Sequence, residues 1–421
     1  MQRYGAYKDS GVEWIGEIPE GWEISKGKAL YDITTGKLDV NAGEDDGAFP
    51  FFTCSMQPRR INEYAFDCEA LLVAGNGIVG FTQYYKGKFN AYQRTYVLSN
   101  FRNVYPGFLR YYVSNNLMTE VAPNSVGSVI QFIKMGDLRN FIICAPPLSE
   151  QQAIADYLDW KTAEIDSIVS QTERSIELLR EYRKSVISEA VTKGLDPDAP
   201  MKDSGVEWIG EIPTGWGIGR MGDIAQYKKG PFGSSLTIGM FVDEKRAVAK
   251  VYEQKNAIQA DASLGHYYID AQKYTELEAF EVKPGDIIVS CAGTIGKCFE
   301  IPVGAYPGII NQALMRVRLN SGLDKRYFLF LFEVVLDAMA IIYSNGSAIK
   351  NIPPFSTLKP FKIPLPFFEK QQAIADYLDE KTAEIDSLIA DKQRQVELLK
   401  EYRKSFISEA VTGKFKVPGL E

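Results

Sequence analysis

The sequence predicts an α+β protein: two globular mixed α/β domains held apart by two long antiparallel coiled-coil helices, in a pseudo-two-fold, circular organisation. Three observations predict this class. A short segment, Lys8–Trp22, recurs as Lys202–Trp216 with one mismatch. A long segment, Gln151–Thr192, recurs as Gln371–Thr412 with 31 of 42 positions identical. The segments between these repeats share only scattered residues, so a duplicated frame holds two unlike inserts, as in pseudo-symmetric repeat proteins.

The length of 421 residues predicts two to three domains. The order of repeats and inserts gives the expected boundaries. We expect a first globular domain at 1–150, a first long helix at 151–192, a linker at 193–201, a second globular domain at 202–370, a second long helix at 371–412 and a tail at 413–421.

The composition is that of a globular protein, with 45% hydrophobic and 24% charged residues. Its five cysteines are scattered and form neither a disulfide framework nor a metal-binding pair, so we expect a cytoplasmic protein. The net charge of −7 resides in the repeated frame, because the first insert is neutral and the second carries +3. This distribution permits the inserts to bind nucleic acid without demonstrating that they do.

Each long repeat has the pattern of a coiled-coil helix. It lacks Gly and Pro, and apolar residues recur every seven positions. The expected seam residues are Leu158, Ile165, Leu179 and Val186 in the first copy, and Leu378, Ile385, Leu399 and Phe406 in the second. Polar Thr172 and Lys392 occupy the middle of the seam, and the intervening positions are assigned to Ile154, Ile168 or Val169, Ile176, Tyr182 and Ala190. We favour pairing of the two helices with each other; the alternative is that each packs on its own domain or mediates dimerisation.

The inserts are weakly related to each other. Ala70–Gly80 aligns with Asp286–Gly296, and in each an apolar, β-branched run ends in a glycine-rich tip, the pattern of a buried strand that leads into a tight turn. The aromatic segments Phe108–Val113 and Tyr327–Tyr343 look helical. We therefore expect two diverged α+β domains, of which the second insert is 26 residues longer.

Polar residues near these tips are candidate DNA contacts. Gln and Asn side chains pair with adenine edges and Arg with guanine. Each such residue has a structural alternative as a solvated or turn-forming group, and each tip glycine could simply permit a positive φ. The candidates are Asn76, Gln93, Arg94, Ser128 and Gln131 in the first insert, and Thr294, Lys297, Asn311, Gln312, Ser347 and Lys350 in the second.

The sequence shows no catalytic site and no metal site. His266 is the single histidine, which excludes a histidine-based triad or a multi-histidine metal centre. The segment 293–297 (GTIGK) resembles a phosphate-binding loop but lacks its first glycine and its Ser/Thr. Asn351–Phe355 (NIPPF) departs from the adenine-methyltransferase motif by one inserted residue, and we expect a turn there.

The motifs together resemble the specificity subunit of type I restriction–modification enzymes. They are the P-x-G-W segments Pro19–Trp22 and Pro213–Trp216, the glycine-rich turn Thr294–Lys297, and the segments Pro146–Asp159 and Pro364–Asp379, each followed by a T-A-E-I-D helix. The resemblance covers essentially the whole chain. The first tip departs from it, since Gly75–Gly80 lacks the Thr and Lys of the second.

The resemblance implies a non-catalytic subunit that binds double-stranded DNA, with each recognition domain reading one half of a bipartite, asymmetric site. It implies that the helices set the spacer and dock two adenine-N6 methyltransferase subunits, which bind S-adenosylmethionine. Restriction–translocase subunits that use ATP and Mg²⁺ would join them, and no membrane is involved. Two other hypotheses stay open on the residues alone: a coiled-coil scaffold that joins protein partners without sequence-specific DNA binding, and a cryptic single-chain methyltransferase or nuclease.

Overall fold

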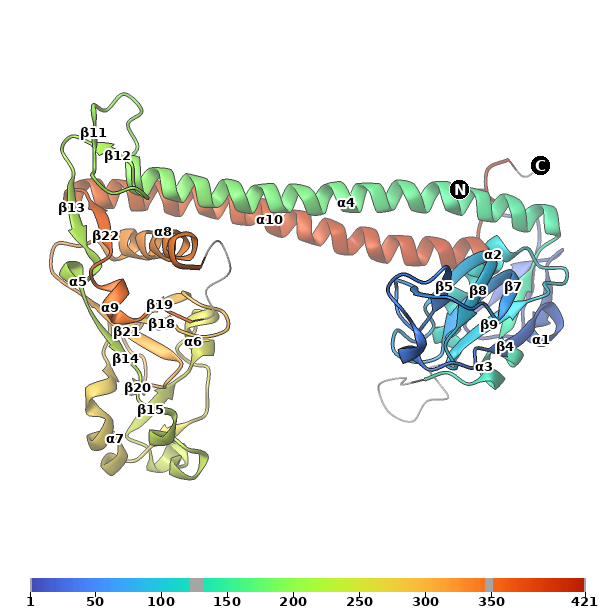
Figure 1. Ribbon diagram of the computed structural model, residues 1–421, viewed down its shortest axis with the longest axis horizontal. Coiled ribbons are helices and arrows are strands. Elements are labelled where there is room, and N and C mark those ends of the chain that lie inside the picture. Colours follow the sequence, from blue (N-terminus) through green and yellow to red (C-terminus); the bar gives the residue numbers. More distant parts are fainter. Residues whose placement is uncertain (1, 122–131, 345–350, 420–421) are drawn as a thin grey trace. The chain divides into compact units, whose positions relative to one another are not determined.

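The computed structural model of the chain describes residues 2–121, 132–344 and 351–419. It divides into two compact units. The first consists of residues 1–175 and 391–421, and the second of residues 176–390. Each unit therefore contains one short repeat, one insert and part of both long helices (Figure 1).

A six-stranded sheet in the order β4-β9-β7-β8-β5-β6 forms the centre of the first unit. Side chains alternate across its central strand, because successive residues of a strand face opposite sides. Leu71 and Val73 enter the core beneath helix α2, while Ala70 and Leu72 pack with Phe89 on the other face. The strands are β4 (Asp32–Thr35), β5 (Phe49–Phe52), β6 (Arg59–Ile61), β7 (Phe66–Ala74), β8 (Thr82–Ala91) and β9 (Thr95–Ser99).

Short elements and one longer helix complete the first unit. The predicted aromatic helix is confirmed as α2, which buries Phe108 and Tyr112 against the sheet. Two small two-stranded sheets pair β1 with β2 and β3 with β10. The elements are β1 (Tyr7–Asp9), β2 (Glu17–Pro19), β3 (Glu23–Lys26), α1 (Gly27–Leu30), η1 (Val40–Ala42), α2 (Pro106–Val121), α3 (Met135–Asn140) and β10 (Ile142–Ala145).

The second unit contains two four-stranded sheets, in the orders β14-β21-β18-β19 and β16-β15-β20-β17. Small sheets again pair β11 with β12 and β13 with β22. The strands are β11 (Met201–Asp203), β12 (Glu211–Pro213), β13 (Gly217–Arg220), β14 (Ala225–Lys229), β15 (Ala249–Tyr252), β16 (Tyr268–Ile269), β17 (Glu281–Val282), β18 (Ile287–Ser290), β19 (Cys298–Glu300), β20 (Gly308–Ile310), β21 (Leu314–Leu319) and β22 (Lys362–Leu365). The helices are α5 (Met221–Ile224), η3 (Gly233–Ser235), η4 (Ile238–Met240), η5 (Glu244–Arg246), α6 (Gln254–Ile258), α7 (Ala271–Leu277), η6 (Glu278–Phe280), α8 (Lys325–Ser344) and α9 (Phe355–Leu358).

The two units share one core arrangement. The order β4-β9-β7-β8 of the first sheet matches β14-β21-β18-β19 of the second unit, and α8 takes the place of α2 in the sequence. The units differ around this core: the first extends the same sheet by β5 and β6, whereas the second builds a separate sheet from β15, β16, β17 and β20. The prediction of two homologous, diverged α+β domains is therefore confirmed.

The long helices are α4 (Leu148–Lys193) and α10 (Phe368–Val411), each of which begins three residues before the predicted start. Most predicted seam residues are buried, and Leu179 and Leu399 are half-buried. The intervening positions needed correction. Of the two alternatives, Val169 is buried in the seam and Ile168 is 38% exposed. Tyr182 is 49% exposed, and Arg183 takes its place in the seam. The helix carries apolar residues on two faces, so an apolar side chain alone does not identify the face that is buried within the chain.

The two long helices run antiparallel, and equivalent ion pairs fix their register. In the first unit Arg403 of α10 donates to Asp166 of α4 at 3.0 Å. In the second unit the repeat-related residues Arg183 and Asp386 form the same pair at 3.1 Å. The same ion pair joins α4 to α10 within each unit, which confirms the predicted pairing of the two helices (Figure 1).

The end of each long helix packs on a copy of the short repeat. After α10, Gly413 adopts φ +72°, and a Cβ there would lie 2.4 Å from Cδ of Pro19. The next residue, Lys414, donates from Nζ to the carbonyls of Ile15 and Glu17, at 2.6 Å each. After α4, Gly194 packs in the same way against Trp216 of the second copy. The last helix thus packs on the first repeat, which confirms the circular organisation.

A buried glutamine joins each long helix to its recognition domain. Gln151 accepts a hydrogen bond from the backbone N–H of Tyr105 at 2.7 Å and donates to the carbonyl of Pro146 at 2.8 Å. Gln371 makes the equivalent bonds with Asp324 and Pro366, at 2.9 and 2.8 Å. Both side chains are at most 2% exposed. The first glutamine of each Q-Q motif is therefore a structural residue.

Candidate nucleic-acid interface

The glycine tip of the first unit lies beside the turn between β8 and β9. The N–H of Gly75 donates to the carbonyl of Arg94 at 2.9 Å, and a Cβ at Gly75 would lie 2.5 Å from that oxygen. Gly77 adopts φ +65°. The close approach requires glycine and brings together the predicted residues Asn76, Gln93 and Arg94.

The side chains at this first tip face solvent. Gln93 and Arg94 are exposed, and Asn76 is half-buried. The amide of Gln93 lies 3.5 Å from Asp39, at the limit of a hydrogen bond. Within the described part of the chain, the guanidinium of Arg94 has no hydrogen-bond or ion-pair partner. The exposed amide of Gln93 and the guanidinium of Arg94 therefore offer N–H donors, and base edges and phosphates can accept hydrogen bonds from them.

The second unit builds its tip around Ser290. The hydroxyl of Ser290 donates to the carbonyl of Thr294 at 2.6 Å and accepts from the N–H of Lys297 at 2.9 Å. Gly293 and Gly296 adopt φ +66° and +76°. The side chains of Thr294 and Lys297 are left exposed at a fixed turn.

Two further predicted residues of the second unit, Asn311 and Gln312, lie in the adjacent turn between β20 and β21. The N–H of Cys291 donates to the carbonyl of Ala313 at 2.8 Å, which holds this turn beside the tip. Asn311 uses its side-chain oxygen to accept from the N–H of Ala313 at 3.0 Å, so that oxygen serves the turn. Gln312 is exposed. Ser128, Gln131, Ser347 and Lys350 lie outside the described residues.

Sequence reasoning missed one loop beside Gln312. After β14 the chain passes through Gly230, where a Cβ would lie 1.8 Å from the carbonyl oxygen of Asn311. Phe232 follows and is 87% exposed, whereas the repeat-equivalent residue of the first unit, Leu38, is half-buried and forms a β-bridge with Tyr92. The one available signal was the basic pair Lys228-Lys229 directly before Gly-Pro-Phe.

The tips do not resemble catalytic centres. Strand β19, and not a helix, follows the segment 293–297, so the helix N-terminus of a phosphate-binding loop is missing there. Burial raises the pKa of Cys291, beside the second tip, to about 11, which keeps its thiol protonated at neutral pH. Over the described ranges, no three His, Cys, Asp or Glu residues are grouped so that they could hold a metal ion.

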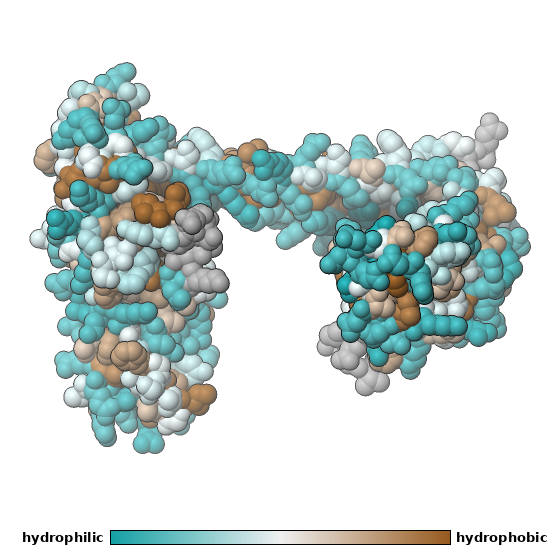
Figure 2. All heavy atoms as spheres, viewed as in Figure 1, coloured by the Kyte–Doolittle hydropathy of each residue, from teal (hydrophilic) through white to brown (hydrophobic). Residues whose placement is uncertain are grey.

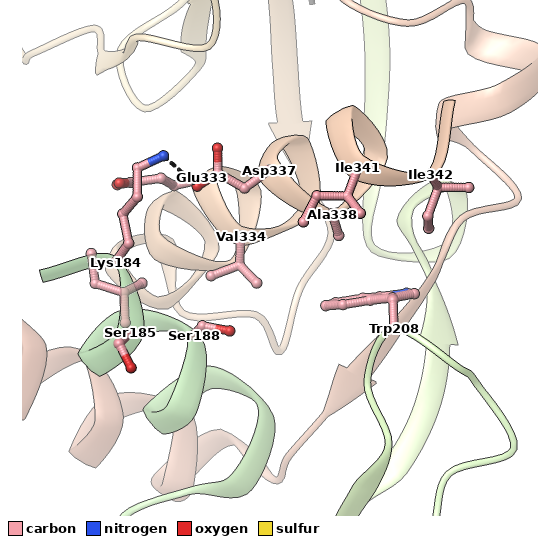
Figure 3. Close-up of a pocket in the computed structure, with 11 residues that line it drawn as sticks. Lys184, Ser185, Ser188, Trp208, Glu333, Val334, Asp337, Ala338, Ile341 and Ile342 are labelled. Atoms are coloured by element: carbon pink, nitrogen blue, oxygen red, sulfur yellow. Dashed lines mark hydrogen bonds and ion pairs between the residues drawn. The ribbon is translucent and has the colours of Figure 1, made fainter. Parts of the chain in front are cut away.

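A further cavity of the second unit lies between the repeated frame and helix α8 of the insert. It has a volume of about 390 Å³ and is lined by α8, the end of α4 and the short repeat. Figure 3 shows the ring of Trp208 on one side and Val334, Ala338 and Ile341 on the other. Lys184 closes one end with an ion pair to Asp337 at 2.9 Å. The lining is mainly apolar and combines residues of the frame with residues of α8.

The long helices expose a second set of apolar side chains, and the set is duplicated. Leu178 and Tyr182 of α4 are each 49% exposed, and their repeat equivalents Leu398 and Tyr402 are 55% and 45% exposed. Residues four apart lie one above the other on a helix. Figure 2 shows hydrophobic spheres interrupting the hydrophilic surface of these helices. Each unit therefore carries the same apolar patch, 178/182 or 398/402.

Comparison with known proteins identifies the family. The model described as "Type I restriction modification DNA specificity domain" matches twice, at residues 19–178 and 213–398. The chain belongs to the type I restriction–modification DNA specificity family. The two matches coincide with the two copies of the frame and insert, so the predicted resemblance is confirmed.

Relatives of known name agree with this assignment. The specificity subunit of the type I restriction enzyme EcoDI of Escherichia coli is 25% identical over 94% of this chain and 89% of its own length. The putative MjaX specificity subunit of Methanocaldococcus jannaschii is 24% identical over 96% of both chains.

Solved structures share the fold. A chain from a structure on complex assembly and conformational transition of the type I R-M system matches with a TM-score of 0.71, at 15% identity, and covers 94% of this chain and 98% of that one. The HsdS subunit from Thermoanaerobacter tengcongensis matches with a TM-score of 0.51, at 17% identity, and covers 97% of this chain and 99% of that one. In the part of the chain that is described, no helix has the length and apolar character needed to cross a membrane.

Proposed function

We propose that this DNA specificity protein reads a bipartite, asymmetric site in double-stranded DNA, one half with each recognition domain. The observation that carries the proposal is that one strand order supports two chemically different tips. The first presents Asn76, Gln93 and Arg94, and the second presents Thr294, Lys297 and Gln312. Two unlike sets of donors on one scaffold recognise two unlike sequences, because base edges are distinguished by their pattern of donors and acceptors.

The duplicated patches 178/182 and 398/402 support docking of two adenine-N6 methyltransferase subunits. Identical patches at repeat-related positions bind two copies of the same partner. In this proposal S-adenosylmethionine binds to those subunits, and ATP and Mg²⁺ bind to separate restriction–translocase subunits. The specificity chain supplies recognition in the cytoplasm and carries out no chemical step itself.

The paired helices act as the ruler of the site. The lengths of α4 and α10 follow from the helix rise of about 1.5 Å per residue. The repeated ion pairs fix the register of one helix against the other. The unspecified spacer between the half-sites is then a property of the frame, while the half-site sequences are properties of the inserts.

A binding experiment separates this proposal from a scaffold that does not bind DNA. The methylated motif is mapped in a host that carries the chain with its methyltransferase subunit, and the purified complex is titrated with a duplex containing that motif across a salt series. We expect specific binding that weakens with salt, and Arg94→Ala should reduce the salt slope by about one. Lys8→Ala, which removes an exposed charge from the frame hairpin, is the matched control.

Two results would contradict the proposal. Equal affinity for the motif and for a scrambled duplex would favour the scaffold. Measurable binding of S-adenosylmethionine to the isolated chain, by isothermal titration, would favour a cryptic methyltransferase.

A further inference from the structure

Phe232, on the loop that follows β14, is an exposed aromatic residue that lines a cavity. The cavity has a volume of about 570 Å³, and Lys228, Lys229, Phe232, Phe280, Phe355 and Gln312 line it. Aromatic rings stack with bases, an amide pairs with base edges, and lysines contact phosphates. Aromatic rings, an amide and two lysines line this one cavity, and these are the groups with which proteins bind bases and phosphates.

The loop that carries Phe232 is held at both ends. Pro231 is buried, and Leu236 is 8% exposed. Between them the N–H of Ser235 donates to the carbonyl of Phe232 at 2.9 Å. Phe232 itself is 87% exposed. A ring on a short, fixed loop loses little conformational freedom when it is buried by a partner, so it is suited to insertion.

Gln312 stands beside this ring and also lines the neighbouring cavity formed with Leu236 and Phe241. Its side chain therefore sits where two hollows meet. The nearby rings already accept cations: Nζ of Lys228 lies 4.9 Å from the centroid of Phe280, and Nζ of Lys359 lies 5.4 Å from that of Phe355. Phe232 has no such partner among the described residues.

We propose that Phe232 inserts between two neighbouring base pairs of the second half-site, and that Gln312 reads the base edge exposed at that step. Lys228 and Lys229 hold the flanking phosphates. Side chains such as Phe unstack a base step when they enter it, and the gain in contacts offsets the loss of stacking. This inference rests on the proposed DNA recognition and assigns the residues that perform it in the second domain. The first domain lacks the device, since Leu38 is held in its β-bridge with Tyr92.

The test uses the whole complex and a duplex carrying the mapped motif. 2-Aminopurine is placed at each position of the second half-site in turn, because its fluorescence rises when it is unstacked. We expect one step to show a rise that Phe232→Ala abolishes and Phe232→Tyr preserves. Phe232→Ala should weaken binding by about 5- to 150-fold. Gln312→Ala should relax discrimination at a single base pair of that half-site.

Val303→Ala is the matched control, because Val303 is 93% exposed in the same unit and lines neither cavity. A failure of the wild-type complex to bind the motif would overturn the proposed function itself. If the wild-type complex binds but Phe232→Ala leaves affinity and fluorescence unchanged, DNA recognition stands and the insertion is wrong. Loss of complex assembly with Phe232→Ala, seen by size exclusion, would assign the ring to a protein partner and would also overturn the inference.

Discussion

The two glutamines at the start of α4 offer a direct test of how the frame holds the recognition domains. Gln151 is fully buried and bonds the backbone of Tyr105 and Pro146. Gln152 is exposed, and its amide donates only to Asp156, at 3.0 Å. The two residues are adjacent and chemically identical, so each is the control for the other.

The expected magnitude follows from the groups that lose their partners. Gln151→Ala removes a hydrogen-bond partner from the N–H of Tyr105 and from the carbonyls of Asn103 and Pro146. The bond to Pro146 is buried and the other two are partly buried, and each buried group left unpaired costs about 1–3 kcal/mol. We expect the free energy of unfolding of the first unit to fall by roughly 2–5 kcal/mol. Gln152→Ala should change it by less than about 0.5 kcal/mol.

Native-state hydrogen exchange measures this effect where it arises. The amide of Tyr105 should exchange about 30-fold faster or more in Gln151→Ala, while amides of the second unit keep their rates. Gln371→Ala should reverse the pattern and destabilise the second unit, with exposed Gln372 as its control. Equal effects of Gln151→Ala and Gln152→Ala would refute the structural role of the buried glutamine.

Three further predictions address docking, spacing and pH. Tyr182→Ala should weaken binding of the methyltransferase subunit by about tenfold without lowering Tm, as measured by titration of the purified subunits. Glu181→Ala changes the adjacent exposed residue and should alter neither the affinity nor Tm. Inserting three heptads after Thr172 and after Lys392 lengthens both helices by about 31 Å and should enlarge the mapped spacer by about nine base pairs, near one DNA turn, with unchanged half-sites. Burial raises the pKa of Tyr252 to about 12, so its contribution to stability is present below the unfolded value near 10 and is lost as pH rises from about 10 to 12. Denaturant unfolding at increasing alkaline pH should show this fall, and Tyr252→Phe should reduce it.

The sequence predicts the frame well because its signals are local and repeated. The seven-residue spacing of Leu158, Ile165 and Val186 reports a buried helix face directly. The tips at Gly75 and Gly293 follow from apolar runs that end in glycine. In the structure Gly75 lies close to the carbonyl of Arg94, and Gly293 adopts φ +66°.

The corrections share a different physical cause. Tyr182 was assigned to the seam because it is apolar, and Ile168 was left as an alternative to Val169, yet Tyr182 and Ile168 lie on the second apolar face of the same helix. Phe232 was missed because an aromatic residue in a sequence is expected to be buried, and only the packed fold shows that this one is not. Both errors fall on surfaces that we assign to partners, where apolar side chains are kept exposed.

The repeated ion pairs contribute more to geometry than to stability. Arg183 and Asp386 are 24% and 55% exposed in their side chains, so their pair is worth at most about 1 kcal/mol. Its repetition as Asp166 with Arg403 nevertheless selects one antiparallel register among the heptad-spaced alternatives. A ruler needs this selectivity, because a slip of one heptad would shift the two helices by about 10 Å.

In the proposed function, two unlike domains on one repeated frame each read half of a split DNA site. The most direct measurement is the map of methylated adenines in the genome of a host that carries this chain with its methyltransferase subunit. We expect one asymmetric motif in two parts, separated by a spacer of fixed length without sequence preference. A continuous motif or a palindromic one would contradict it.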